Sequence, residues 1–186
     1  MRLSQPRIAP MTDAELSDDQ KELLAPMGDR ILNIFRTLVR EPKAMKGFMA
    51  WGNYVLSRRN GLPAREREIV ILRIGYLCKS GYEWTQHVAI GKREGLTADE
   101  IAALKVGASA PNWSEADAAL IRAADELHTG QFIGDATWAA LGKHFSQKQQ
   151  MDVVFTAGQY TQVSMMLNTF GVQLDAGLTL DPDLKA

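Results

Sequence analysis

The chain has 186 residues, of which 46% are hydrophobic and 23% charged, and its formal net charge is -1. A globular protein of this size buries its core without a disulfide or a structural metal, and the near-neutral charge gives no indication of binding to nucleic acid or to a membrane surface. The single cysteine, Cys78, excludes an internal disulfide, and the sequence has neither an apolar run long enough to span a membrane nor the apolar part of a signal peptide. We therefore expect a cytoplasmic protein.

The helices follow one another along almost the whole chain. Thr12 with Glu15 three positions later is typical of a capping box, which predicts a first helix over 13–24. Apolar residues then recur at helical spacing between short turns that contain glycine, proline or a capping serine or threonine. Further helices are expected over 31–38, 42–56, 64–79, 82–94, from 97, over 114–127, from 134 or 135, and over 146–170.

No segment shows the alternating pattern of a β-strand, and the apolar run at 69–72 lies inside a longer helical stretch. We therefore predict an all-α fold of eight or nine helices. The connections are short, which indicates one compact domain over 13–174. An extended N-terminal arm over 1–12 and a C-terminal arm over 175–186 are expected on either side of it.

Reactive side chains gather in residues 78–87. Glu83 and His87 are four residues apart on a predicted helix, so they share one face. If this helix folds back on the preceding one, Glu68 can approach the same face. Two carboxylates beside an imidazole can transfer protons near neutral pH. Since pairs at this spacing are also common in purely structural positions, a structural role stays open.

The segment PAREREIVILRIGYLCKSGYEWTQHVAIGKREGLTADEIAAL resembles the carboxymuconolactone decarboxylase family, which includes the alkylhydroperoxidase-D-like proteins. The later segment GQYTQVSMMLNTFGV is similar to the C-terminal part of the same group. The resemblance covers most of residues 30–174. It implies an alkylhydroperoxidase-D-like fold, a small-molecule substrate, no cofactor, and assembly with copies of itself into a homotrimer or homohexamer.

The resemblance also indicates which branch of the family the chain follows. The redox branch has a glutamate, two cysteines and a histidine at the positions that correspond to Glu68, Ser80, Glu83 and His87. Both thiols are therefore missing, and Cys78 lies two positions before the first of them. A dithiol mechanism needs an attacking thiolate and a second cysteine that resolves the intermediate. The match is thus to the branch without the cysteine pair, in which proton transfer accompanies decarboxylation or lactone chemistry.

We therefore predict a cofactor-independent lyase of aromatic catabolism that acts on a small, aromatic-derived carboxylic acid or lactone. His87 is the expected general acid or base, and Glu83 and Glu68 are its expected partners. Arg73 is a candidate to hold a substrate anion, with a buried ion pair as the alternative. The expected substrate-binding residues are Tyr82, Trp84, Arg73, Tyr160, Gln159 and Asn168.

Two other functions stay open. One is an alkylhydroperoxidase-like peroxidase or thiol redox protein that uses Cys78, and the other is a non-catalytic ligand-binding oligomer. The three histidines, His87, His128 and His144, lack the spacing of metal ligands, so no metal site is expected. Polar residues of the last long helix could equally form hydrogen bonds between subunits.

Overall fold

The computed structural model describes residues 1–111 and 113–185. Within these residues the chain forms nine α-helices and three short 3-10 turns, and no β-strand. The prediction of an all-α fold with eight or nine helices is confirmed. The helices are α1 (Asp18–Leu24), α2 (Asn33–Leu38), α3 (Pro42–Leu56), α4 (Ala64–Leu77), α5 (Gly81–Arg93), α6 (Ala98–Val106), α7 (Glu115–Gly130), α8 (Asp135–Gly142) and α9 (Gln147–Phe170).

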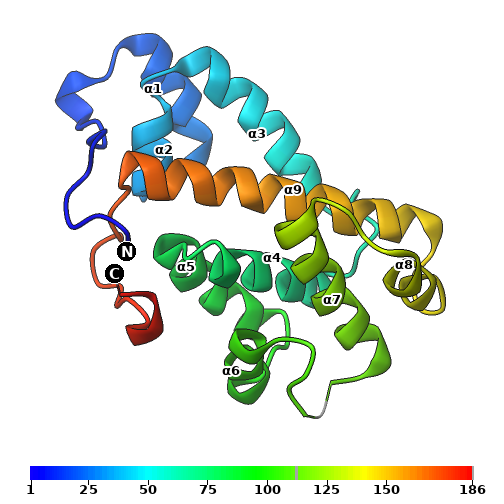
Figure 1. The fold of residues 1–186 in the computed structure, drawn as a ribbon. Helices are drawn as coiled ribbons and strands as arrows, with labels where there is room; N and C mark the ends of the chain where they lie inside the picture. The colour runs from blue at the N-terminus through cyan, green and yellow to red at the C-terminus, as the bar shows by residue number, and fades with distance from the viewer. Residues whose placement is uncertain (112, 186) are drawn as a thin grey trace.

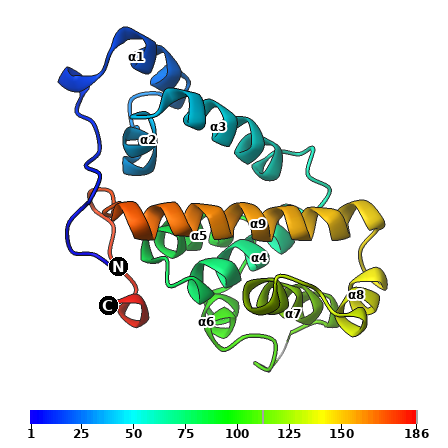
Figure 2. The same ribbon diagram turned by 45° about the horizontal axis from the view of Figure 1, so that its top comes forward.

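The long helix α9 divides the molecule into two parts. Helices α1, α2 and α3 lie on one side of α9, and α4 to α8 lie on the other (Figures 1 and 2). The two terminal segments lie next to each other near the C-terminal end of α9, where the N-terminal amine of Met1 donates to the carbonyl of Leu184. This arrangement places α5 and α9 beside each other and α3 across them.

Helix α4 is the centre of the core. Its residues Ile69 to Leu72 and Ile74 have no exposed surface. A helix that is apolar on every side has to be covered on every side, and α4 packs against α5, α6, α7 and α9. The complete burial explains why its apolar run shows no amphipathic pattern and is helical nonetheless.

The first predicted helix differs from the structure because it is divided. The capping box over 12–15 is present, but it closes only a 3-10 turn, Asp13–Glu15. Leu16 is extended and packs into a small apolar cluster, and α1 starts afterwards with Ser17 as its cap. Burial of Leu16 therefore separates two elements that periodicity alone joins.

Both terminal segments are packed on the helices. The backbone amides of Arg7 and Ile8 donate to the carbonyl of Phe170 over 2.8 and 3.1 Å. In the C-terminal segment Leu184 is buried, and Asp175 accepts a hydrogen bond from the backbone amide of Asn33 over 2.8 Å. The segments predicted as arms therefore add hydrogen bonds and apolar contacts to the helical part.

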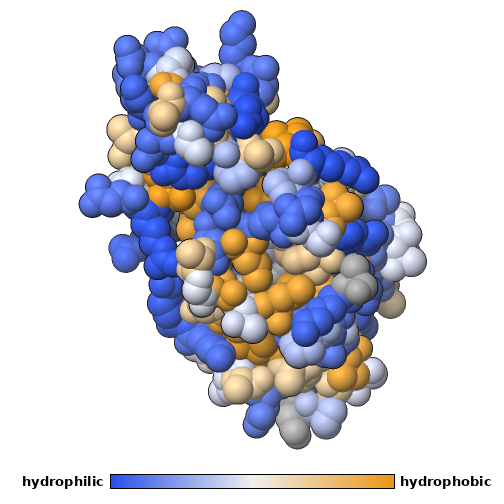
Figure 3. Space-filling model, turned by 90° about the vertical axis from the view of Figure 1, so that its left-hand side faces the viewer, coloured by the Kyte–Doolittle hydropathy of each residue, from blue (hydrophilic) through white to orange (hydrophobic). Residues whose placement is uncertain are grey.

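No helix in the described part of the chain is long and apolar enough to cross a membrane. Apolar side chains nevertheless reach the surface on one face, below the hydrophilic end of the molecule (Figure 3). Large apolar side chains with substantial exposure include Phe132, Val106, Met165, Met151, Leu56 and Trp51.

Candidate active site

A short turn joins α4 to α5 and lets these consecutive helices pack against each other. The backbone amide of Ser80 donates to the carbonyl of Gly75 over 2.9 Å, and Lys79 has left-handed backbone with φ of 54°. The two helices also pack closely further along, because a Cβ on Gly91 would lie only 3.2 Å from Cδ1 of Leu72. The chain thus folds back on itself with little space between α4 and α5.

Three side chains between these helices form a continuous row. Nδ1 of His87 lies 2.7 Å from Oε2 of Glu68, and Nε2 of His87 lies 2.9 Å from Oε1 of Glu83. The exposed fractions of Glu68, Glu83 and His87 are 1%, 4% and 6%. Both ring nitrogens face carboxylates, which suits a doubly protonated imidazolium. We call this arrangement the Glu68–His87–Glu83 row; it unites the three residues that were expected to be catalytic.

The two carboxylates determine the protonation of the imidazole. Burial disfavours a positive charge on His87, but the negative charges of Glu83 and then Glu68 outweigh it and raise the pKa of His87 to about 10. His87 is therefore doubly protonated and positively charged at neutral pH. Among the described residues, no group of three or more His, Cys, Asp or Glu side chains has the arrangement of a metal site.

Tyr160 of α9 closes the row from the other side. Its ring meets the ring of His87 edge to face, with centroids 4.9 Å apart and planes at 83°. Burial, followed by the charges of Glu83 and Glu68, raises the pKa of Tyr160 well above its usual value. The phenol therefore stays neutral and acts as a wall beside the imidazolium.

A cavity of about 240 Å³ opens beside the row, and we call it the His87 cavity. Glu83 and His87 form part of its wall, whereas Glu68 is not part of the lining. Apolar side chains from α2, α3, α5 and α9 form most of the remainder. The uncharged polar residues of the wall are Asn53, Tyr82, Gln86, Gln159 and Tyr160.

Tyr82 is held in the wall by the C-terminal segment. Its hydroxyl donates to Oδ2 of Asp175 over 2.6 Å, and the amide of Gln86 donates to the same oxygen over 2.7 Å. Burial, and then the hydrogen bond to Asp175, raise the pKa of Tyr82. Neither partner of Tyr82 was predicted from the sequence. Gln86 is four residues after Tyr82, which was an available signal, whereas Asp175 lies in an irregular segment without one.

Trp84 and Arg73, both predicted to bind substrate, do not line the cavity. The indole of Trp84 donates to Asp181 over 3.0 Å. Nε of Arg73 pairs with Asp125 at 2.6 Å, and its Nη1 donates to the carbonyl of Leu104 over 2.7 Å. The structure therefore shows Arg73 in the ion pair that was its alternative role, and Arg73 does not line this cavity.

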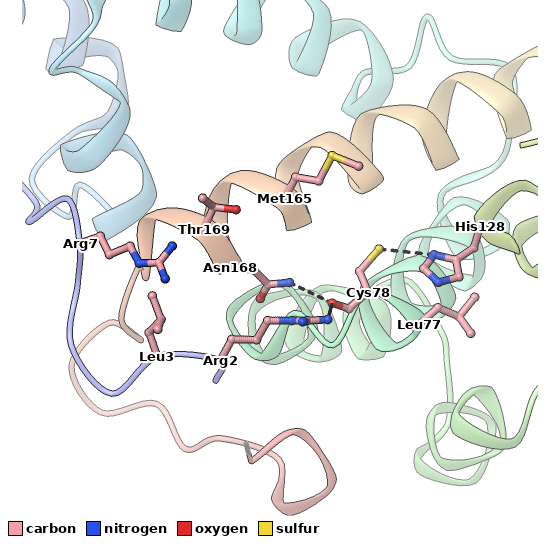
Figure 4. A pocket seen from close by; sticks show the side chains of 9 residues that line it. All are labelled: Arg2, Leu3, Arg7, Leu77, Cys78, His128, Met165, Asn168 and Thr169. Carbon is pink, nitrogen blue, oxygen red and sulfur yellow. Dashed lines mark hydrogen bonds between the residues drawn. The ribbon is translucent and has the colours of Figure 1, made fainter.

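Cys78 lies elsewhere, in a wider groove of about 560 Å³ that we call the Cys78 groove. Figure 4 shows its thiol facing His128, with 3.6 Å between Sγ and Nδ1. Asn168, expected to bind substrate, donates instead to the carbonyl of Cys78 over 2.9 Å. Arg2, Arg7 and Thr169 complete the polar part of this groove.

The thiol of Cys78 is not activated by these neighbours. Burial raises its pKa and outweighs the polar groups nearby, including Arg2, that lower it. Because the thiolate is the reactive form, Cys78 is a weak nucleophile at neutral pH.

Part of the chain matches a known family model. Residues 42–126, which extend from α3 into α7, match the model of the carboxymuconolactone decarboxylase family. No curated protein matches the chain. Several solved structures are similar to it over most of their length.

The first is a peroxidase-related protein from Ralstonia eutropha JMP134 with an alkylhydroperoxidase AhpD core, which has a TM-score of 0.76 and 21% identity over 93% of this chain and 95% of that chain. The second is a protein of unknown function from Agrobacterium tumefaciens, with a TM-score of 0.69 and 23% identity over 75% of this chain and 95% of that chain. The third is the debrominase Bmp8 in complex with 2,3,4-tribromopyrrole, with a TM-score of 0.73 and 12% identity over 93% of this chain and 94% of that chain.

At these identities the structures establish the fold alone. The family match covers the two helices that carry the Glu68–His87–Glu83 row. The chain thus matches the model of the carboxymuconolactone decarboxylase family over residues 42–126 and has an AhpD-like fold.

Proposed function

We propose that the protein is a cofactor-independent lyase that transfers protons to and from a small, aromatic-derived carboxylic acid or lactone. The observation that carries the proposal is the position of the Glu68–His87–Glu83 row, which is buried and yet meets a cavity through Glu83 and His87. Buried charged groups that are held by partners and open to a cavity are typical of acid–base sites.

The three residues have different roles in this proposal. Glu83 and His87 contact the substrate, because they form part of the cavity wall. Glu68 acts through His87: it holds Nδ1 and helps to keep the ring protonated, so it is a positioning residue. Glu83 faces the Nε2 proton of His87. In this proposal the proton passes between Nε2 of His87 and the carboxylate of Glu83 at the cavity wall.

Two bond cleavages suit such a row. In a decarboxylation, the bond to the carboxylate carbon breaks, carbon dioxide leaves, and the remaining carbanion takes the proton of His87. In a lactone opening, Glu83 removes a proton from the carbon next to the ring carbon that bears oxygen. The released electron pair forms a double bond, and the ring oxygen leaves as a carboxylate. Exchange of one proton with water restores the row in both cases.

The thiol route has less support in the structure. Cys78 is part of a different pocket, its pKa is raised by burial, and the chain has no second cysteine to resolve an oxidised thiol. Its partner His128 lies 3.6 Å from the sulfur. We therefore rank acid–base chemistry in the His87 cavity above redox chemistry in the Cys78 groove.

A substrate screen with matched variants tests the proposal. The purified protein is incubated with unsaturated lactones and aromatic acids, and products are identified by mass spectrometry. Glu83→Gln keeps the shape of the side chain but removes its charge, and we expect kcat to fall by about 10²–10⁴-fold, the usual contribution of a general acid or base. Glu68→Gln lowers the pKa of His87 and shifts the pH dependence of kcat to lower pH.

Two variants serve as controls. Glu66→Gln changes a carboxylate on the same helix that pairs with Arg65 at 3.6 Å instead of His87, and we expect its turnover to match the wild type. Cys78→Ala should also retain full turnover. Undiminished activity of Glu83→Gln, or a peroxide-reducing activity that is lost in Cys78→Ala, would overturn the proposal.

We also propose that the protein works in the cytoplasm as a homo-oligomer, in line with the family resemblance. Trp51 of α3 is exposed, and its ring stacks on Tyr54 and meets Phe155 of α9 edge to face. Exposed aromatic clusters of this kind favour association. Multi-angle light scattering should give a mass that is a multiple of 20.6 kDa; a monomer at micromolar concentration would contradict assembly.

A further inference from the structure

The wall of the His87 cavity has an unusual charge balance for a site that binds organic acids. Within the described part of the chain, no lysine or arginine lines it. The buried Arg73 is paired with the partly exposed Asp125 and does not line the cavity. Arg67, whose charge reaches Tyr160, donates to the carbonyl of Ser57 over 3.3 Å and is not part of the wall.

The row itself adds negative charge to this wall. It contains one imidazolium, on His87, and two carboxylates, on Glu68 and Glu83. A ligand with a carboxylate would have to leave water for a cavity beside a buried row that carries an excess of one negative charge, with Glu83 and His87 in the wall and Glu68 behind them. Such a transfer is unfavourable unless a cation compensates it.

One polar group of the wall lacks a partner. Oε1 of Gln159 is buried and has no hydrogen bond to the described residues, and the exposed fraction of the whole residue is 4%. The side chain belongs to the lining of the cavity, and its Nε2 lies opposite Gly52, where an added Cβ would be 3.5 Å away. A buried polar atom without a partner is costly, so a ligand that hydrogen-bonds to this amide gains affinity.

From these observations we propose that the His87 cavity selects a neutral, single-ring ligand whose polar edge hydrogen-bonds to Gln159, and that it rejects carboxylates. The size is suitable, since a cavity of about 150 Å³ is enough for benzene and this one has about 240 Å³. The inference rests on the proposed function and narrows it. A neutral lactone is then the substrate class, its ring carbon–oxygen bond is the one that breaks, and the anionic product is repelled by the row.

A matched pair of probes tests the charge selectivity apart from turnover. At pH 7, 4-hydroxybenzamide is neutral and 4-hydroxybenzoate is an anion, while the ring and the hydroxyl are the same. We expect isothermal titration calorimetry of the full chain to give a Kd for the amide at least tenfold lower than that for the benzoate. Equal or tighter binding of the benzoate would overturn the proposal, and so would the absence of amide binding at millimolar concentration.

Three variants locate the binding. Gln159→Leu removes the unpaired amide and should raise the Kd of 4-hydroxybenzamide at least fivefold. Asn168→Ala removes an amide of the same helix that faces Cys78, and it should leave this Kd unchanged. Glu83→Gln removes one negative charge from the wall and should bring the two Kd values closer together. Amide binding that Gln159→Leu does not weaken, or that Asn168→Ala abolishes, would place the ligand elsewhere and refute the inference.

The same measurements separate this inference from the proposed function. If no lactone or acid is turned over but the amide binds selectively, the ligand class holds and the lyase assignment fails. If an anionic acid is turned over and binds as tightly as neutral analogues, the lyase assignment holds and the ligand class fails.

Discussion

His87 and His128 stand in contrasting environments, although each lies beside an acidic side chain. His87 is buried, and both of its nitrogens face carboxylates at 2.7 and 2.9 Å. His128 is half-buried, and its Nδ1 has one weak contact with the thiol of Cys78 at 3.6 Å. Partners on both sides of the ring, rather than the reactivity of a single neighbour, therefore fix the protonation and orientation of His87.

The surrounding charges differ in sign as well. The His87 cavity has a surplus of negative charge and no cationic side chain among the described residues of its lining. The Cys78 groove contains Arg2 and Arg7 and is the more open of the two. Cys78 therefore lies in the less enclosed of the two regions. His87, which is held by two carboxylates, lies nine residues further along the chain.

Replacing each of the two histidines should give the largest difference in the free energy of unfolding between the two regions. His87→Ala leaves the carboxylates of Glu68 and Glu83 buried together without a cation, and we expect it to lower the free energy of unfolding at pH 7 by about 3–5 kcal/mol. His128→Ala removes one weak contact and should change it by about 0.5 kcal/mol or less. Urea denaturation followed by circular dichroism measures both. Similar losses in the two variants would show that the row is not a specially stabilised feature.

The stability of the protein should also depend on pH through His87. Glu83, Glu68 and Tyr160 are the titratable groups packed around His87, and the charges of Glu83 and Glu68 outweigh burial and hold its pKa at about 10, above the ordinary 6.5. Because the folded pKa is the higher one, the stabilisation is complete below pH 6.5 and is lost as the pH rises through 10. The free energy of unfolding should fall by at most about 1.4 kcal/mol per pH unit in this window.

Denaturation at pH 7.0, 7.75 and 8.5 measures this slope. Glu83→Gln removes one of the two charges that raise the pKa of His87, so its slope should be smaller. His128→Ala should retain the slope of the wild type. A slope that is unaffected by Glu83→Gln, or that disappears in His128→Ala, would assign the titration to another group.

The smallest expected effect concerns the thiol. Since burial raises the pKa of Cys78, an aromatic disulfide reagent should label the folded protein at pH 7 roughly tenfold more slowly than the urea-unfolded chain. His128→Ala should change the folded rate by less than about twofold, because the contact at 3.6 Å is weak. Labelling that is faster in the folded protein would indicate an activated thiolate and would favour the redox alternative.

Local patterns were sufficient to predict most of the helices. The capping box of Thr97 with Glu100 starts α6, and Ser146 caps α9 as expected. These signals act within a few residues, so the sequence contains them in full. The split of the first helix escaped prediction because it depends on burial of Leu16 against residues outside its own segment.

The candidate site was predictable only where its contacts lie within one helix or between consecutive helices. Glu83 and His87 share a helix face because of their spacing, and Glu68 reaches them through a short hairpin. Spacing within a helix does not reveal which neighbour each face will meet. The positions of Trp84 and Arg73 depend on Asp181 and Asp125, which are 97 and 52 residues away along the chain. Such long-range partners leave no local pattern in the sequence.

The attachment of Tyr82 and Gln86 to Asp175 has a consequence for synthesis on the ribosome. Gln86 and Asp175 are 89 positions apart. At about 5–20 residues per second, translation takes roughly 4–18 s to cover that distance. A nascent chain therefore carries the complete Glu68–His87–Glu83 row for several seconds before the carboxylate that ties its cavity wall has been made. During that interval the hydroxyl of Tyr82 and the amide of Gln86 lack this partner, and slower translation before position 175 would lengthen it.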